Sequence, residues 1–238
     1  MEKSEKIETI KLFSEFGLPV VPFEILDKES FEEQIIKFSQ KHSLNKFIFR
    51  TGSVKGKILG NPSIVDAQLN KDREYIKTAF DNGYVVMIMI YVDIYHNLHN
   101  LNVMKVGNEI VIEAVGQGFI SRDLNLHGHL HEEITLRLSD FKILERKIVS
   151  SEKYKKSKQR KIKEFDIKEL EENKSFLLNK EDYIPLADYQ IAFTKKIFPK
   201  MEKLASKMGY KDFVANLSFV DFGKEKHQPV FWDLYEVK

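Results

Sequence analysis

Apolar residues recur at helical and strand spacings through the first ninety residues. Helical spacing predicts helices over residues 3–16, 28–42 and about 70–80. The stretch NKFIFRT, residues 45–51, predicts a short strand, and residues 57–60 predict a hairpin arm after it. The second helix is expected to turn these residues inward: Phe31, Ile35, Ile36 and Phe38.

The most apolar run of the chain is VVMIMIYV, residues 85–92. Consecutive apolar residues point to both faces of a strand, so this strand should be interior and covered on both sides. The run is far too short to cross a bilayer as a helix. The N-terminal sequence MEKSEKIETIKLF lacks the apolar core of a signal peptide. We therefore expect a soluble, cytoplasmic protein.

The second half of the chain alternates between strand-like and helix-like segments. The runs LNVMKVG and NEIVIEAVG meet at Gly107-Asn108, which predicts a two-residue hairpin turn. Residues 133–149 predict a strand followed by a helix, and a long helix is expected from about residue 182 to residue 208. VANLSFVDF and PVFWDLYEV predict a final antiparallel pair. Hairpins without regular strand–helix alternation indicate an α+β fold.

Composition narrows the classes of function. Apolar residues make up 42% of 238 residues, and 38 basic residues nearly cancel 36 acidic ones, leaving a net charge of +2. This balance argues against a general nucleic-acid binder. The chain has no cysteine, which excludes disulfides, thiolate catalysis and cysteine-based zinc sites.

A basic run at residues 153–163 holds seven Lys or Arg in eleven positions. A run of this kind is typical of a solvated linker or helix face, and it could also attract nucleic acid or an acidic substrate. Tyr154 is its one aromatic residue, so stacking on single strands lacks support.

Five of the seven histidines lie between residues 96 and 131. His96 and His99 form an H-x-x-H pair, and His127, His129 and His131 alternate, which on a strand would place them on one face. Three imidazoles on one face could bind a transition metal. The alternatives are a solvent-facing polar strand or a surface that meets a substrate.

The segment FRTGSVKGKILG, residues 49–60, combines cations with glycines at a strand end. Arg50 ends the apolar run, and Lys55 and Lys57 follow among Gly52, Gly56 and Gly60. Arginine matches phosphate oxygens with two parallel hydrogen bonds, and glycines let the backbone approach closely. The segment is not a P-loop, and a basic surface hairpin is the competing interpretation.

The order of these segments resembles the ATP-grasp superfamily. FGLPVVPFEI, residues 16–25, is similar to the G-[LIV]-P-x-P phrase of that family, and FIFR places Arg50 where its strand ends in a phosphate-binding cation, usually lysine. TGSVKGKILG is similar to its flap and VVMIMIYVD to its hinge strand. The last two strands are similar to those that carry its metal-binding acids.

A narrower likeness is to the nucleotide-binding region of phosphoenolpyruvate-utilising enzymes. FRTGS, IEAVGQG at residues 112–118 and NLSF are similar to segments of that region.

The resemblance implies an α+β fold of two subdomains whose antiparallel sheets enclose a nucleotide cleft. The N-terminal subdomain would span residues 1–92 with the phosphate flap. The C-terminal subdomain would span residues 93–238 with the metal-binding strands and the basic segment 151–163. The implied function is an ATP- and Mg²⁺-dependent ligase that joins a carboxylate to an amine or another nucleophile through an acyl phosphate. A homodimer is compatible with it.

The resemblance also implies the residues that meet the nucleotide. Arg50, Lys55, Gly56 and Lys57 would contact its phosphates. Backbone atoms of Met89, Ile90 and Tyr91 would bind the adenine edge, and Asp93 the ribose hydroxyls.

The metal ligands implied are Asp233 with Asp221 or Asn216. The reaction would depend on Arg50, Lys57 and Arg122, with Arg122 beside His127 and His129 on the acceptor side. Because one acid is replaced by Asn216 if NLSF aligns, a degenerate nucleotide-binding protein without catalysis is an alternative. A nucleic-acid-associated accessory protein that uses the basic run is another.

Overall fold

The computed structural model describes residues 5–44, 46–53, 63–67, 69–92, 99–116, 130–148, 183–220 and 228–237. The chain forms two compact units, which are described separately. The first comprises Met1–Glu15 and Pro19–Val92, and the second comprises Phe16–Leu18 and Asp93–Lys238. Among the helices of the described ranges, none has the length and apolar character needed to span a membrane.

The first unit is a four-stranded antiparallel sheet with helices, in the strand order β1-β4-β2-β3. Its elements are α1 (Glu5–Glu15), β1 (Phe23–Ile25), α2 (Phe31–His42), β2 (Phe47–Ser53), β3 (Ser63–Ala67), α3 (Leu69–Asp81) and β4 (Tyr84–Ile90). Gly17, with φ of +62°, follows α1 in the left-handed conformation that ends many helices.

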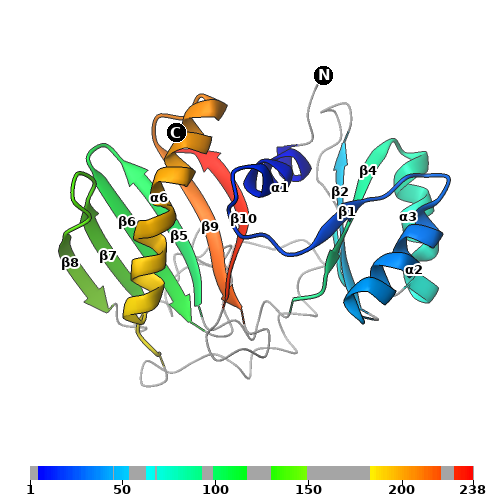
Figure 1. Ribbon diagram of the computed structural model, residues 1–238, viewed down its shortest axis with the longest axis horizontal. Helices are drawn as coiled ribbons and strands as arrows, with labels where there is room; N and C mark the ends of the chain where they lie inside the picture. The colour runs from blue at the N-terminus through cyan, green and yellow to red at the C-terminus, as the bar shows by residue number, and fades with distance from the viewer. Residues whose placement is uncertain are drawn as a thin grey trace, which may run out of the picture. The chain divides into compact units, whose positions relative to one another are not determined.

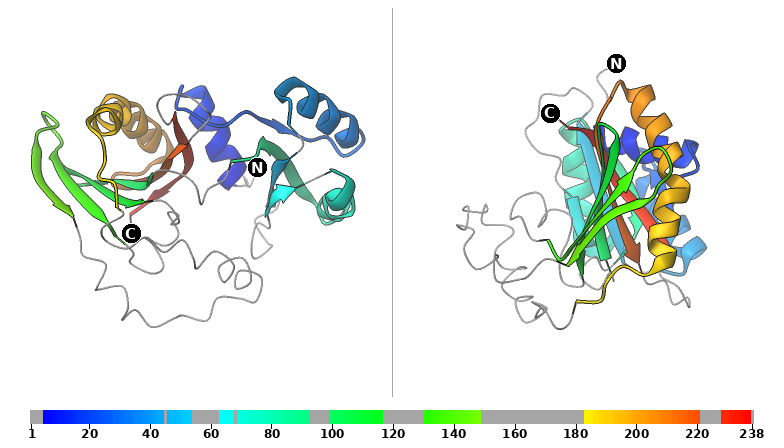
Figure 2. Two further views of the ribbon diagram at one scale, coloured as in Figure 1. Left: turned by 90° about the horizontal axis from the view of Figure 1, so that it is seen from below. Right: turned by 90° about the vertical axis from the view of Figure 1, so that its left-hand side faces the viewer.

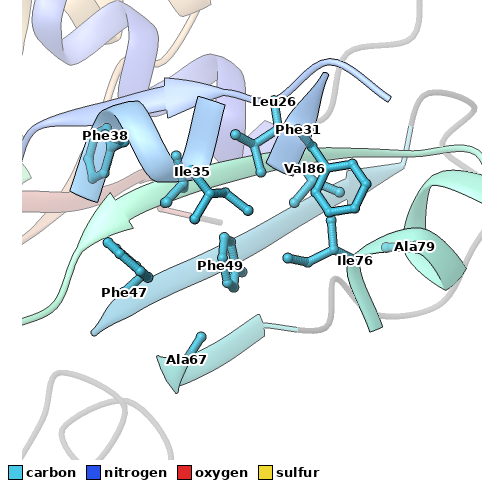
Figure 3. Close-up of a cluster of buried hydrophobic side chains, with 11 residues drawn as sticks. Leu26, Phe31, Ile35, Phe38, Phe47, Phe49, Ala67, Ile76, Ala79 and Val86 are labelled. Atoms are coloured by element: carbon cyan, nitrogen blue, oxygen red, sulfur yellow. The ribbon is translucent and has the colours of Figure 1, made fainter. Parts of the chain in front are cut away.

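Helices α2 and α3 pack on one face of this sheet (Figure 3). Phe31, Ile35 and Phe38 of α2 meet Phe49 and other buried residues of the strands. Four consecutive residues of β4, from Val86 to Met89, are fully buried, which confirms the prediction of an interior strand covered on both faces. The opposite face of the sheet is packed against α1, whose Ile7, Ile10 and Phe13 are buried.

The second unit is a six-stranded antiparallel sheet in the order β10-β9-β5-β6-β7-β8. Its elements are β5 (His99–Val106), β6 (Glu109–Gly116), β7 (Glu132–Arg137), β8 (Ile143–Ile148), α6 (Asp188–Met208), β9 (Phe213–Val220) and β10 (Gln228–Glu236). Gly107, with φ of +57°, lies in the two-residue turn between β5 and β6 and confirms the predicted hairpin.

Helix α6 lies along one face of this six-stranded sheet (Figures 1 and 2). Phe213 of β9 stacks on Phe198 of α6 at 5.7 Å between ring centroids. Phe219 meets Tyr189 and Phe193 edge-on. The odd-numbered residues of β9 therefore face α6, and its even-numbered residues face the opposite side of the sheet.

Three details of the predicted elements are wrong. Helix α6 begins at Asp188 rather than near residue 182, because Tyr183 and the Leu186 amide bond to Glu132 of β7. Residues 143–148 form strand β8 rather than a helix, because a tight turn reverses the chain and lets β8 pair with β7. In that turn Phe141 has φ of +57°, and its amide donates to the carbonyl oxygen of Arg137. Ile36 is 48% exposed, because Ile35 and Phe38 take the inward positions of α2. The α+β class and the antiparallel sheets are confirmed, and the enclosed cleft stays a prediction.

Candidate functional site

Arg50 lies in β2, on the face of the first sheet opposite α2 and α3. It pairs with Met87 of β4 and Ser63 of β3. Its neighbour Phe49 is in the core beneath α2 and α3, so alternation along the strand turns Arg50 to the other face. The side chain is half-buried. A guanidinium held on a strand has a fixed direction, which suits a phosphate contact.

The predicted adenine-binding stretch begins inside the sheet and ends beyond it. Met89 is fully buried, and the Ile90 amide donates to the carbonyl oxygen of Pro22 at 3.2 Å. Tyr91 and Val92 follow the end of β4, and the ammonium of Lys46 lies 5.5 Å from the centre of the Tyr91 ring. The Ile90 amide is therefore already used within the sheet, whereas Tyr91 and Val92 lie past the strand pairing.

Several predicted site residues lie outside the described residues. They are Lys55, Gly56, Lys57, Asp93, Arg122 and Asp221, together with His96, His127 and His129. Their roles stay predictions.

A row of polar side chains crosses the second sheet on the face opposite α6. Each member is directly opposite the next in the pairing of adjacent strands. The members of this polar row are Asp233 of β10, Asn216 of β9, Asn102 of β5, Glu113 of β6, Glu133 of β7 and Lys147 of β8. The row joins two of the predicted metal ligands, Asp233 and Asn216, to Glu113 of the segment IEAVGQG and to three residues that sequence reasoning did not single out, Asn102, Glu133 and Lys147.

Hydrogen bonds connect the centre of the polar row. Asn216 Nδ2 donates to Asn102 Oδ1 at 2.5 Å, and Asn102 Nδ2 donates to Glu113 Oε2 at 3.1 Å. Asn102 and Asn216 are only 2% and 7% exposed. Buried polar groups need such partners, because an unsatisfied amide costs about 1–3 kcal/mol.

Glu113 has a raised pKa. Burial is the largest cause, because it penalises the charged form of the carboxyl. The hydrogen bond from Asn102 acts in the opposite direction, and the charge of Glu133 adds to the rise. Glu113 therefore keeps its proton to a higher pH than an exposed glutamate does.

A β-bulge in β10 places Trp232 next to Asp233. The pairing with β9 shifts between Phe231 and Asp233, so Trp232 is the extra residue. Its Nε1 donates to Ser218 Oγ at 2.6 Å, and Ser218 Oγ in turn donates to Asn100 Oδ1. Trp232 therefore lies on the same face as the polar row, one residue from Asp233.

Asp233 and Asn216 suit a magnesium ion. They are direct partners across β9 and β10, where facing Cβ atoms are about 4.5–5.5 Å apart. Carboxylate and amide oxygens are hard ligands, and Mg²⁺ is commonly held by one or two protein groups with waters and substrate phosphates. Within the described ranges, no group of three or more His, Asp or Glu is placed to hold a metal ion.

A second polar cluster lies on the α6 side of the sheet, around Glu132. Glu132 is fully buried and accepts hydrogen bonds from Arg146 Nε at 2.6 Å, Tyr183 Oη at 2.7 Å and the Leu186 amide at 2.8 Å. Arg146 also donates to the carbonyl oxygen of Leu186 at 2.8 Å. The cluster fixes the segment before α6 onto β7 and β8.

His99 and His131 take part in this packing. His99 Nδ1 lies 3.0 Å from Gln190 Nε2, and its Nε2 lies 2.6 Å from the Ile184 carbonyl oxygen. Because the Gln190 amide nitrogen can only donate, His99 Nε2 carries the proton. His131 Nδ1 accepts from the Gly116 amide at 3.0 Å. Both ring nitrogens of His99 and one of His131 are thus engaged within the protein.

The polar row had a visible signal in the sequence. In HNLNVMKV, Asn100 and Asn102 alternate with Leu101 and Val103. Alternation of this kind marks a strand with one polar face. The second polar cluster, around Glu132, had no such signal in the sequence, because the hydrogen-bond partners of Glu132 come from distant parts of the chain.

No protein-family model matches the chain, and no curated protein matches it in sequence. Several solved structures resemble it. D-alanyl-alanine synthetase A from Vibrio cholerae has a TM-score of 0.49 and 11% identity, over 98% of this chain and 54% of that chain. Phosphoribosylamine–glycine ligase from Thermotoga maritima has a TM-score of 0.49 and 14% identity, over 98% of this chain and 47% of that chain.

A third similar structure is a RiPP-associated ATP-grasp ligase from Chryseobacterium gregarium, in complex with ADP and a leader and core peptide. It has a TM-score of 0.45 and 10% identity, over 97% of this chain and 51% of that chain. The chain spans about half the length of these proteins. It is thus similar in structure to ATP-grasp enzymes at low sequence identity.

Proposed function

We propose that the chain binds ATP with Mg²⁺ and joins a carboxylate to an amine or another nucleophile through an acyl phosphate. The observation that carries this proposal is the pairing of Asp233 with Asn216 at the end of a polar row whose central amides, Asn216 and Asn102, are buried. Two oxygen-bearing side chains on one sheet face suit a hard cation, and Mg²⁺ neutralises charge on transferring phosphates when bound.

Each proposed residue has a separate task. Asp233 and Asn216 would hold the cation, with Asp221 as a further ligand. Arg50 would contact phosphate oxygens through its planar fork, supported by Lys55, Gly56 and Lys57. The backbone after β4, at Tyr91 and Val92, would meet the adenine edge beside Met89 and Ile90. Asp93 would accept hydrogen bonds from the ribose, and Arg122 would orient the acceptor.

The reaction proceeds in two displacements. A carboxylate oxygen of the substrate attacks the γ-phosphorus, the bond to the β-phosphate oxygen breaks, and ADP leaves. The amine then attacks the acyl carbon, loses a proton and expels inorganic phosphate. Phosphoryl transfer depends on positioning and charge neutralisation, which cationic and metal-binding residues supply.

A second candidate is nucleotide binding without catalysis. It is favoured by Asn216, because a neutral amide binds Mg²⁺ more weakly than a carboxylate and leaves Asp233 as the one acid of the pair. The two candidates share the nucleotide site and differ in turnover.

Thermal unfolding with ATP tests the shared site. At 100 times its Kd a ligand stabilises by about 2.7 kcal/mol, which raises Tm by roughly 5–10 °C in a chain of this size. We expect this shift with ATP and Mg²⁺ and a smaller one with ATP and EDTA. Release of ADP with pools of amino acids and carboxylates then separates a ligase from a binding protein. The absence of a shift with any nucleotide would contradict the proposal.

A further inference from the structure

The hydrogen bonds of the polar row have a direction. A carboxamide has an oxygen at one end and an NH₂ group at the other, and a chain of two carboxamides can run either way. Above its raised pKa the Glu113 carboxyl is ionised, and an ionised carboxylate can only accept a hydrogen bond. Two hydrogen bonds link three side chains in series: Asn216 donates to Asn102, and Asn102 donates to Glu113 at the end of the series. Because Glu113 accepts from Asn102 Nδ2, Asn102 must present Oδ1 to Asn216, and Asn216 must present Nδ2 to Asn102.

The far side of Asn216 follows from this direction. With Nδ2 committed to Asn102 on β5, Asn216 turns Oδ1 away from β5. The strand on its other side is β10, where Asp233 is its direct partner. A reversed chain would instead turn an NH₂ group toward Asp233, and an NH₂ group cannot bind a cation.

We propose that Glu113 is a positioning residue for the cation site, because it fixes the direction of the Asn216–Asn102–Glu113 chain and thereby keeps Asn216 Oδ1 on the side of Asp233. This inference rests on the proposed function, in which Asp233 and Asn216 hold Mg²⁺. Glu113 does not touch the cation itself and acts through Asn102.

Burial makes the direction matter. Asn102 and Asn216 are almost completely buried, so water has little access to an amide that turns the wrong way. A reversal at one residue would place oxygen against oxygen or NH₂ against NH₂. The two amides must therefore reverse together, and the side chain at position 113 determines in which direction their hydrogen bonds run.

Glutamine at position 113 separates this role from simple packing. Glu113→Gln keeps the side-chain shape and still offers an oxygen to Asn102. It also offers an NH₂ group, so it permits both directions. If Glu113 only fills space and satisfies Asn102, glutamine replaces it without consequence.

The first experiment measures direction without any ligand. In Asn216→Asp, Asn102 lies between two carboxylates that only accept hydrogen bonds. Its amide oxygen therefore faces a carboxylate oxygen in either orientation of the amide. Adding Glu113→Gln lets the chain reverse, with Gln donating to Asn102 and Asn102 donating to Asp. We expect Asn216→Asp to lower Tm and the double variant to regain about 3 °C or more.

The matched control for that experiment is Glu113→Met combined with Asn216→Asp. Methionine removes the same negative charge as glutamine but cannot donate a hydrogen bond. Relief of charge repulsion alone would raise Tm equally in both double variants. Recovery that is specific to glutamine supports the directed chain, and equal recovery overturns it.

The second experiment measures the cation. Mn²⁺ replaces Mg²⁺ as the probe, and its EPR signal reports free Mn²⁺ in titrations with ATP present. We expect Glu113→Gln to weaken Mn²⁺ binding about tenfold, the lower end of the range for residues that orient metal ligands. Binding of ATP at saturating Mn²⁺ should change little. Glu133→Gln is the control, because Glu133 is the next acid in the row and pairs with Lys147 at 4.0 Å.

The outcomes distinguish this inference from the proposed function. If the wild-type protein binds neither Mn²⁺ nor ATP, the proposed function fails and this role of Glu113 fails with it. If the wild type binds both and Glu113→Gln binds Mn²⁺ equally well, only the role of Glu113 is overturned. If Glu113→Gln and Glu133→Gln weaken Mn²⁺ binding equally, the effect is one of charge, and the positioning role is overturned.

Discussion

The indole nitrogen of Trp232 donates a hydrogen bond to the hydroxyl oxygen of Ser218, at 2.6 Å. This bond fixes the ring on the face of the sheet that carries the polar row, one residue from Asp233. Trp232 is the single tryptophan of the chain. We expect ATP with Mg²⁺ to change its fluorescence emission in a saturable titration, because a ligand at Asp233 and Asn216 would alter the surroundings of the indole.

The control for this titration is Trp232→Phe, which should lose the fluorescence response and keep most of the thermal shift with ATP. An unchanged emission in wild-type protein that is nevertheless stabilised by ATP would place the nucleotide away from Trp232.

Arg50 is the proposed phosphate contact on strand β2 of the first unit. Arg50→Ala should abolish the thermal shift with ATP and leave the Tm of the unliganded protein nearly unchanged, whereas Arg50→Lys should retain part of the shift as a point charge. Differential scanning calorimetry with and without ATP measures both quantities.

The matched control is Arg73→Ala, which removes a half-exposed arginine that pairs with Glu32 on the same unit. A pair of this kind contributes about 0.2–1 kcal/mol to stability and should not affect ATP. Normal ATP binding by Arg50→Ala would show that the phosphate site lies elsewhere.

Asp233 is the charged member of the proposed cation pair. Asp233→Asn should weaken Mg²⁺ binding at least about tenfold, so that the thermal shift with ATP and Mg²⁺ falls toward the shift with ATP and EDTA. Isothermal titration with Mg²⁺ in the presence of ATP measures the loss. Asp140→Asn, which breaks a surface pair with Arg137, should bind like the wild type. An Asp233→Asn variant with unchanged Mg²⁺ dependence would remove Asp233 from the site.

Local patterns were sufficient to predict most elements of the fold. The spacing of apolar residues predicted α1, α3 and both final strands, and Gly107-Asn108 predicted the hairpin of β5 and β6. The helix predicted near the end of residues 133–149 was wrong, because ILERKI carries no clear strand alternation. Its strand conformation comes from pairing with β7 after a turn at Phe141, a long-range effect that propensity does not contain.

The site was only partly predictable for a related reason. Asp233 and Asn216 were identified as candidates by resemblance, and their direct pairing depends on the register of β9 and β10. The bulge at Trp232 sets that register, and the sequence VFWDLYEV contains no pattern that predicts a bulge. Glu113 was noticed as part of IEAVGQG, and its bond to Asn102 required knowledge of which residues face each other on β5 and β6.

Glu132 should contribute strongly to stability. Glu132→Ala leaves Arg146, Tyr183 and the Leu186 amide without their shared acceptor. Breaking a buried pair in this way costs about 3 kcal/mol, which lowers Tm by roughly 6–12 °C in a chain of this length. Thermal unfolding followed by circular dichroism measures the change. Glu145→Ala, which removes an exposed partner of Lys147, should shift stability by no more than about 0.5 kcal/mol. Equal effects of the two substitutions would contradict this role of Glu132.

The raised pKa of Glu113 predicts how stability depends on pH. Burial raises the pKa above the ordinary value of 4.5, with a further rise from Glu133 and an opposing effect of the Asn102 hydrogen bond. Between pH 4.5 and the raised pKa, the Glu113 carboxyl of the folded protein holds a proton that the same group has released in the unfolded protein. The stability that Glu113 contributes is therefore complete below pH 4.5 and is lost as the pH rises through the pKa of the folded state.

Glu113→Gln does not titrate at this position, so the difference in Tm between Glu113→Gln and the wild type should increase as the pH rises above 4.5. Calorimetry from pH 4 to pH 8 measures this difference. Glu133→Gln should narrow the pH window, because it removes the charge that adds to the rise in the pKa. A difference that stays flat or decreases with pH would mean that Glu113 is not held protonated by burial. An increase would show that ionisation of the buried Glu113 carboxyl costs stability in the folded protein.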